Sequence, residues 1–460
     1  MSCHAEHRKS FDPLRRLFPC LQGVFCAVAF GSLHLLFSTS ALAVEEPVRF
    51  LEKLRAVGYL DTAGDYLEYL QKSDLVDDEF KKTIPYEKAV LLVAKASRVG
   101  DRGQTLVLLK EAIEQFKNFA TSQPDSPRAI DVRFQITNVY MALAKASLAR
   151  SQQPGIVKAD AQKEARDYYQ KALQEVVETE KVVQSSRKKV RTDLSAARKA
   201  AGRGSGSQSS TTKLTPKEKQ LIEQRDKLRT DWMNSELKQA EIIRLTATTY
   251  PEGSGERKGE LGKAASAYEE LFLKHDGRVI GLYCRLQQGR CLTEMGRYDE
   301  AIDALAELID LGQSEDSRLQ TFGLKAVRYS IECYIAKKDY KNATNMAKIE
   351  LDENPQGAVV DGIRFFYAKA KVEHAATLTP DKKGEKDKLL KQASKIYKGL
   401  TKSKTTAEWK VKATEELLAM GAIKVQEEKP QGEPTNFDEA FSAAAAVMRQ
   451  RSILGKAVAK

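Results

Sequence analysis

The sequence has few of the residues that build common metal and redox sites. Its 460 residues include six Cys and five His, and three of those Cys lie in the first 30 residues. The later cysteines are Cys284, Cys291 and Cys333, an odd and widely spaced set that does not predict a disulfide framework. The later histidines, His275 and His374, lie almost 100 positions apart, and no CxxC accompanies them. We therefore expect no zinc, haem or iron–sulfur site, and no cofactor.

Motifs for catalysis are also absent. The stretch Gly259-Glu-Leu-Gly-Lys-Ala lacks the spacing of a phosphate-binding loop, and Ala264 stands where that loop needs a hydroxyl side chain. There is no GxSxG sequence, and no Cys has an evident His partner. The prediction is that the protein is not an enzyme and has no evident small-molecule substrate. An envelope hydrolase with a pocket that the sequence does not reveal is the residual alternative.

Proline, glycine and aromatic residues are scarce, and charge is abundant. The chain has 13 Pro, 27 Gly and 7% aromatic residues, against 30% charged residues. Ala, Leu, Lys, Glu and Gln dominate instead, which favours an all-helical structure. Beyond the first 43 residues, no apolar run is long enough to cross a membrane.

The start of the chain has the pattern of a secretory signal peptide. Four Lys or Arg precede an apolar run at 24–37, and Ala-Leu-Ala follows at 41–43. The apolar run is shorter than the roughly 18 to 20 residues of a spanning helix. We expect 1–43 to be cleaved and the remainder to be exported, to a periplasmic, cell-envelope or extracellular location. The alternative is a retained N-terminal membrane anchor.

Six positions pair an Ala with a Leu or aromatic residue four places later. Such residues share one face of a helix, where the small side chain lets a neighbouring helix approach and the large one fills the space beside it. The pattern predicts successive pairs of amphipathic helices. The pairs are Ala63/Leu67, Ala112/Phe116, Ala165/Tyr169, Ala264/Tyr268, Ala301/Leu305 and Ala393/Tyr397.

The segment 282–355 resembles a tetratricopeptide (TPR) repeat. Gly289 and Ala301 agree with the family pattern W-x2-L-G-x2-Y…A-x3-F…P, whereas Arg285 and Gln288 replace its Trp and Leu. Over 48–425 the likeness is looser, because the Ala landmarks are 37 to 99 residues apart rather than about 34. A generic helical array without true repeats is the alternative.

This resemblance implies an all-α, TPR-like solenoid of helical hairpins, similar to exported bacterial members of the family. TPR-like helical pairs are expected over 44–177 and 234–425. Proteins of this family bind peptides or partner proteins in a concave groove. The resemblance therefore implies a protein partner. A polar linker at 426–435 and a terminal amphipathic helix at 436–460 complete the expected organisation.

An antiparallel coiled-coil hairpin is predicted at 178–233, between the two sets of pairs. Val and Leu recur every seven residues along a helix from about 159 to 201 and along a second one beginning near Thr215-Pro216. The Gly/Ser-rich stretch 202–212 between them has the composition of a flexible tip. Glu180 and Arg187 interrupt the apolar seam.

The predicted hairpin carries nearly all of the excess positive charge. Residues 181–229 contain 14 Lys or Arg and four acidic residues, a net +10 out of +12 for the chain. Such a patch attracts an anionic membrane surface or an acidic envelope polymer, whereas nucleic acid is not expected as a partner outside the cytoplasm. A solvated helix face that keeps the protein soluble is the competing interpretation. The candidate contact residues are Arg187, Lys188, Lys189, Arg191, Arg198, Lys199 and Arg203.

Two functions follow as hypotheses. The first is a non-catalytic, exported scaffold that binds proteins in the groove of the solenoid. The alternative is an adaptor that docks on an anionic membrane or envelope polymer through the basic hairpin.

Overall fold

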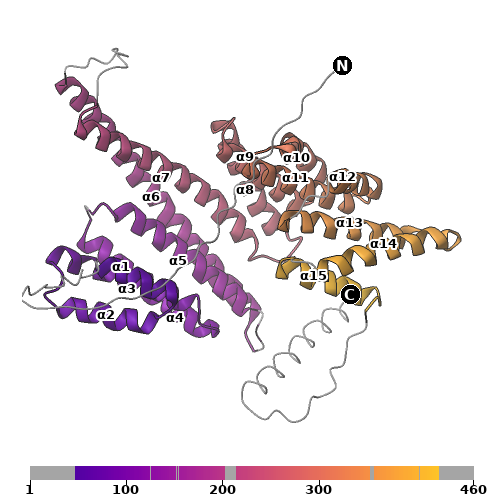
Figure 1. Ribbon diagram of the computed structural model, residues 1–460, viewed down its shortest axis with the longest axis horizontal. Helices are drawn as coiled ribbons and strands as arrows, with labels where there is room; N and C mark the ends of the chain where they lie inside the picture. Colours follow the sequence, from indigo (N-terminus) through magenta and orange to yellow (C-terminus); the bar gives the residue numbers. More distant parts are fainter. Residues whose placement is uncertain are drawn as a thin grey trace, which may run out of the picture. The chain divides into compact units, whose positions relative to one another are not determined.

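The computed structural model describes residues 47–423, except 125, 152, 154, 202–213, 353–356 and 403–404 (Figure 1). The predicted signal peptide, the hairpin tip at 202–212, the linker and the terminal helix lie outside the described residues, as does Arg203. The chain divides into a short unit, Met1–Phe50, of which 47–50 are described, and a second unit beginning at Leu51. No helix in the described part is both long enough and apolar enough to cross a bilayer.

Throughout the described ranges, regular secondary structure is helical. The α-helices are α1 (Pro47–Val57), α2 (Leu60–Lys72), α3 (Asp78–Ala96), α4 (Arg102–Ser122), α5 (Ala129–Arg150), α6 (Lys158–Ala200), α7 (Pro216–Ala247), α8 (Gly255–Lys274), α9 (Val279–Met295), α10 (Tyr298–Ile309), α11 (Ser317–Ala336), α12 (Tyr340–Asp352), α13 (Ala358–Thr377), α14 (Lys383–Lys402) and α15 (Ala407–Ala419). Two short 3₁₀ helices, η1 (Asp310–Gln313) and η2 (Pro380–Lys382), precede α11 and α14.

The helices pack against their near neighbours in the chain. From α2 to α15, each helix contacts the one that follows it, and from α9 onward the odd-numbered helices also contact one another: α9 with α11, α11 with α13, and α13 with α15. Contacts restricted to neighbouring units are what defines a solenoid. The prediction of an all-α, TPR-like solenoid is confirmed.

The six Ala/large-residue pairs occupy the even-numbered helices α2, α4, α6, α8, α10 and α14. All twelve side chains are 0 or 1% exposed. In α12 the corresponding residues are Ala343 and Ala347, so that Ala replaces the large side chain, and both are fully buried as well. The even-numbered helices therefore supply the buried seam, as the sequence pattern predicted.

Gly289 marks a close approach between α9 and α10. A Cβ at this position would lie 2.7 Å from side-chain carbons of Leu305 in α10, so only glycine permits this packing without a shift. α9 ends at Met295 and is followed by Gly296, whose φ of 82° places it in the left-handed region. Lys338 occupies the equivalent turn between α11 and α12, 42 residues later, with a φ of 61°. The two helix pairs thus repeat one turn geometry with different residues.

The three cysteines fill small buried positions in this array. Cys284, Cys291 and Cys333 are free and 0% exposed. Burial raises the pKa of Cys284 and of Cys291 to about 12 and that of Cys333 to about 11. Thiols with such pKa values remain protonated at neutral pH, so these residues pack as small apolar groups.

The hairpin consists of the long helices α6 and α7. α6 is one 43-residue helix and α7 has 32 residues, so neither helix breaks at the expected boundaries near 178 and 234. α6 also packs on α5, and α7 also packs on α8. The hairpin is therefore an extension of two solenoid helices, and Figure 1 shows their far ends running past the neighbouring helices.

The start of α7 and the hairpin seam follow from local sequence. Thr215 caps α7, with Pro216 in the first turn, and Thr215 and Glu218 form a reciprocal capping box. Val183, Val190 and Leu228 form a buried cluster between α6 and α7. Leu214, which continues the seven-residue spacing, precedes α7 and is 40% exposed.

Candidate functional site

Six of the seven predicted contact residues lie on α6. Lys188, Lys189, Arg191, Arg198 and Lys199 are exposed. None of the five forms an ion pair with an acidic residue in the described part of the chain. They form a positively charged face whose charge is open to solvent.

Arg187 differs from these residues because it turns toward α7. Its guanidinium carbon lies 4.4 Å from the centre of the Trp232 ring, and the side chain is half-buried. Glu180, about two turns earlier on the seam, accepts hydrogen bonds from Trp232 Nε1 at 3.3 Å and Gln239 Nε2 at 2.6 Å. The two polar residues that interrupt the predicted seam thus have specific partners on α7.

A pocket that the sequence did not predict lies on the odd-numbered helices of the array. Its volume is about 570 Å³, and its walls come from α9, α11, α15 and the start of α13. Because these helices contact one another in succession, they form one continuous face of the solenoid. We call this the array pocket; its lining residues are Arg290, Thr293, Glu294, Lys325, Arg328, Tyr329, Glu332, Ala358, Val359, Thr406, Glu408, Trp409 and Lys412.

Most charges in the array pocket are paired. Arg290 Nε lies 3.0 Å from Glu294 Oε1, and Lys412 Nζ lies 2.7 Å from Glu408 Oε1. A third pair, Arg328 Nη1 to Glu332 Oε1, is longer at 3.4 Å. Burial raises the pKa of the Glu332 carboxyl, against the opposing effect of Arg328 and other nearby cations. The pocket therefore offers charges of both signs, not a single strong field.

Trp409 forms the aromatic wall of the array pocket. It is 5% exposed and packs against Phe365, with ring centres 5.3 Å apart. Gly362 makes room for it, because a Cβ there would lie 2.9 Å from the indole ring. Lys412 Nζ lies over the indole ring, 4.5 Å from its centre.

The array pocket could not be predicted from the sequence because its residues come from four separate helices. The available signal was indirect: Gly362 and Trp409 are a small and a large residue 47 positions apart, and no helical periodicity links them. Within the described residues, no group of His, Cys, Asp or Glu is arranged to hold a metal ion.

Comparison with known proteins gives limited similarity. No protein-family model matches the chain. No curated protein matches it either. A crystal structure of the P58(IPK) TPR domain is 15% identical, with 76% of this chain and 99% of that chain covered and a TM-score of 0.24. The description of this chain as TPR-like rests on its own helix pairs and their packing.

Proposed function

We propose that this chain is an exported, non-catalytic scaffold that binds a partner protein at the array pocket. The observation that carries the proposal is that α9, α11, α13 and α15, which form one continuous face, also share one pocket. In helical solenoids such a face is the extended surface available to a partner.

The composition of the array pocket supports a protein partner. Trp, Tyr and Arg are enriched at the energetic centres of protein interfaces, and Trp409, Tyr329 and Arg328 meet here. Arg328 lies 4.3 Å from the Tyr329 ring centre and 5.8 Å from that of Trp409. These stacked side chains lose little further freedom when a partner binds.

A site-specific photo-crosslinker tests the proposal. A benzophenone amino acid replaces Lys325, which lines the array pocket, and in a separate protein it replaces Lys341, which is exposed on α12. We expect one defined protein to crosslink from position 325 and not from position 341. Lys325→Glu should then weaken binding of that purified protein, whereas Lys341→Glu should not. Equal crosslinking from both positions contradicts the proposal.

The basic face of α6 supports a second function, an adaptor for an anionic membrane or envelope polymer. Its support is the exposure of five cations that have no acidic partner in the described part of the chain. Charge reversal of Lys188, Lys189 and Arg191 should abolish sedimentation with anionic vesicles, and binding by the wild type should fall steeply as salt rises.

A charge-matched control separates the adaptor from general attraction to a basic protein. Lys388, Lys391 and Lys395 are exposed on α14, and their reversal changes the net charge by the same amount. The adaptor function requires that this control still sediments with the vesicles. Unchanged sedimentation of the α6 variant would end the adaptor proposal and leave the scaffold proposal intact.

A further inference from the structure

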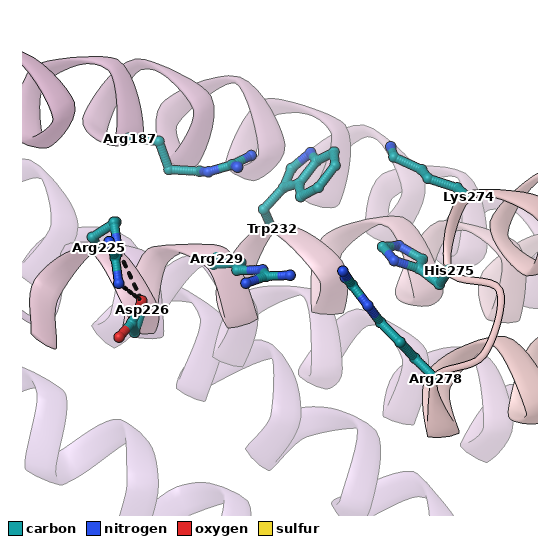
Figure 2. Close-up of a pocket in the computed structure, with 8 residues that line it drawn as sticks. All are labelled: Arg187, Arg225, Asp226, Arg229, Trp232, Lys274, His275 and Arg278. Atoms are coloured by element: carbon teal, nitrogen blue, oxygen red, sulfur yellow. Dashed lines mark hydrogen bonds and ion pairs between the residues drawn. The ribbon is translucent and has the colours of Figure 1, made fainter. Parts of the chain in front are cut away.

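A second pocket lies at the foot of the α6–α7 hairpin, beside the end of α8 (Figure 2). Its volume is about 580 Å³, within the range of about 300–1,000 Å³ for small-molecule sites. It shares no lining residue with the array pocket. We call it the foot pocket; its lining residues are Arg187, Arg225, Asp226, Arg229, Trp232, Lys274, His275 and Arg278.

The foot pocket has more positive charge than its own carboxylates offset. Arg225 pairs with Asp226 at 2.7 Å, and Lys274 pairs with Glu236, which does not line the pocket. The other three cations, Arg187, Arg229 and Arg278, have no acidic partner among the described residues. Three uncompensated guanidinium groups around one cavity repel each other and attract an anion.

The three unpaired arginines come from different elements. Arg187 is on α6, Arg229 is on α7, and Arg278 immediately precedes α9. Figure 2 shows the side chains of Arg229 and Arg278 extending toward one another below Trp232. Arg187 is held by stacking on Trp232, and Lys274 lies over the same indole, 3.9 Å from its centre. All four cations line the same pocket, although they come from different elements.

His275 provides independent evidence for a ligand. It is 3% exposed, yet neither ring nitrogen has a hydrogen-bond partner within the described residues. Its nearest carboxylate oxygen, on Glu236, is 3.9 Å from Nε2. Burial lowers the pKa of His275, and Arg229 and Arg278 act in the same direction. The ring is therefore neutral at neutral pH, with one N–H to donate and a buried polar group to satisfy.

We propose that the foot pocket binds a phosphate group carried by a small molecule or by a lipid headgroup. A phosphate has oxygens in a tetrahedral arrangement, which can accept from donors on several sides at once. A carboxylate has two oxygens in one plane and suits a single guanidinium best. Arginines that reach the cavity from α6, from α7 and from the segment before α9 therefore fit a phosphate better than an acidic side chain.

The site is separate from the scaffold function. The volume of the foot pocket leaves space for the part of the ligand attached to the phosphate. The cations there surround a cavity, whereas those on the outer face of α6 are exposed. A phosphate ligand could then be bound while a protein occupies the array pocket.

Calorimetric titration of the purified chain with inorganic phosphate and with glycerol phosphate tests the proposal. Both should bind saturably, and Arg229→Gln/Arg278→Gln should weaken binding by at least about tenfold. Lys388→Gln/Lys391→Gln is the matched control, since it removes the same charge from an exposed part of α14, outside both pockets. Its affinity should stay within about twofold of the wild type. The ring resonances of His275 should shift as phosphate is added.

Vesicles distinguish the two sources of the phosphate. Binding to phosphatidic acid vesicles that depends on Arg229 and Arg278 assigns a lipid headgroup, and its absence beside saturable glycerol phosphate binding assigns a soluble ligand. The proposal is overturned if neither phosphate probe binds saturably, or if the control variant loses as much affinity as the pocket variant. It is also overturned if a poly-glutamate peptide binds through Arg229 and Arg278 while the phosphate probes do not.

Discussion

The two pockets are alike in size and in construction, yet differ in charge compensation. Each contains one of the two tryptophans of the chain, flanked by two cations: Arg187 and Lys274 at Trp232, and Arg328 and Lys412 at Trp409. In the array pocket the flanking cations face Glu332 and Glu408. In the foot pocket, three arginines lack such partners in the described part of the chain.

This difference shows that the number of cations in a pocket does not by itself indicate an anion site. Paired charges leave a weak net field and suit a mixed protein interface, whereas unpaired charges around a cavity favour an anion. Three kinds of experiment test this difference: replacing each tryptophan, removing the carboxylates that pair with the cations of the array pocket, and titrating the buried histidine.

Replacing the two tryptophans should have the largest and most unequal effect. Trp409 is 5% exposed and belongs to a buried cluster with Phe365 and Tyr397, so Trp409→Ala should cost about 3–5 kcal/mol of stability. Trp232 is only half-buried, and Trp232→Ala should cost clearly less. Urea unfolding followed by far-UV circular dichroism measures both. Equal losses would mean that the array pocket is no more part of the core than the foot pocket.

Removing the carboxylates that pair with the cations of the array pocket should make this pocket bind phosphate, as the foot pocket does. Glu332→Gln/Glu408→Gln leaves Arg328 and Lys412 without their carboxylates, and the chain should gain a second, weaker phosphate site. Calorimetry on a background that carries Arg229→Gln/Arg278→Gln isolates this site. If no phosphate binding appears on that background, charge compensation is not what separates the two pockets.

The buried histidine should make stability depend on pH. Burial lowers the pKa of His275 in the folded protein, with Lys274, Arg278 and Arg229 acting in the same direction and Glu236 opposing them. As pH falls, the unfolded chain takes up this proton first, at about pH 6.5. The contribution of neutral His275 to stability is therefore present above that pH and is lost as pH falls through the lower, folded pKa.

His275→Asn checks this effect. The melting temperature of the wild type should fall more between about pH 7.5 and about pH 5.5 than that of the variant, because Asn does not titrate. Phosphate in the foot pocket should reduce the difference, since an anion stabilises the protonated ring. Parallel pH profiles of the melting temperature for the two proteins would show that His275 does not cause the pH dependence of stability.

The smallest effect is expected away from both pockets, at the turn between α11 and α12. Lys338 has a φ of 61°, where glycine is favoured, so Lys338→Gly should stabilise the protein by about 1 kcal/mol. Lys337→Gly, at a φ of −75°, should not stabilise it. Thermal unfolding measures both, and phosphate binding should be unchanged in each. Destabilisation by Lys338→Gly would contradict the equivalence with the Gly296 turn.

Much of the fold could be predicted because its signals are local. The Ala/large-residue pairs share one helix face, and the Thr215-Pro216 cap fixes the start of α7 through contacts within one turn. The seven-residue spacing of Val183 and Val190 likewise predicts the buried seam of α6.

The pockets could not be predicted because they depend on helix packing. Arg225, Arg229 and Trp232 share one face of α7, but their spacing alone did not mark them as a site. His275 and Arg278 join them only because α8 packs on α7 and ends beside it. A sequence pattern contains no information on that contact. The charged face of α6 was found, but the distinction between Arg187 and its exposed neighbours required the position of Trp232.

The most direct test of the account is phosphate titration of two single-tryptophan proteins by fluorescence. Trp409→Phe leaves Trp232 as the reporter of the foot pocket, and Trp232→Phe leaves Trp409 as the reporter of the array pocket. If the unpaired cations make the foot pocket a phosphate site, the emission of Trp232 should change saturably and that of Trp409 should not. A saturable change at Trp409, or no change at Trp232, would contradict it.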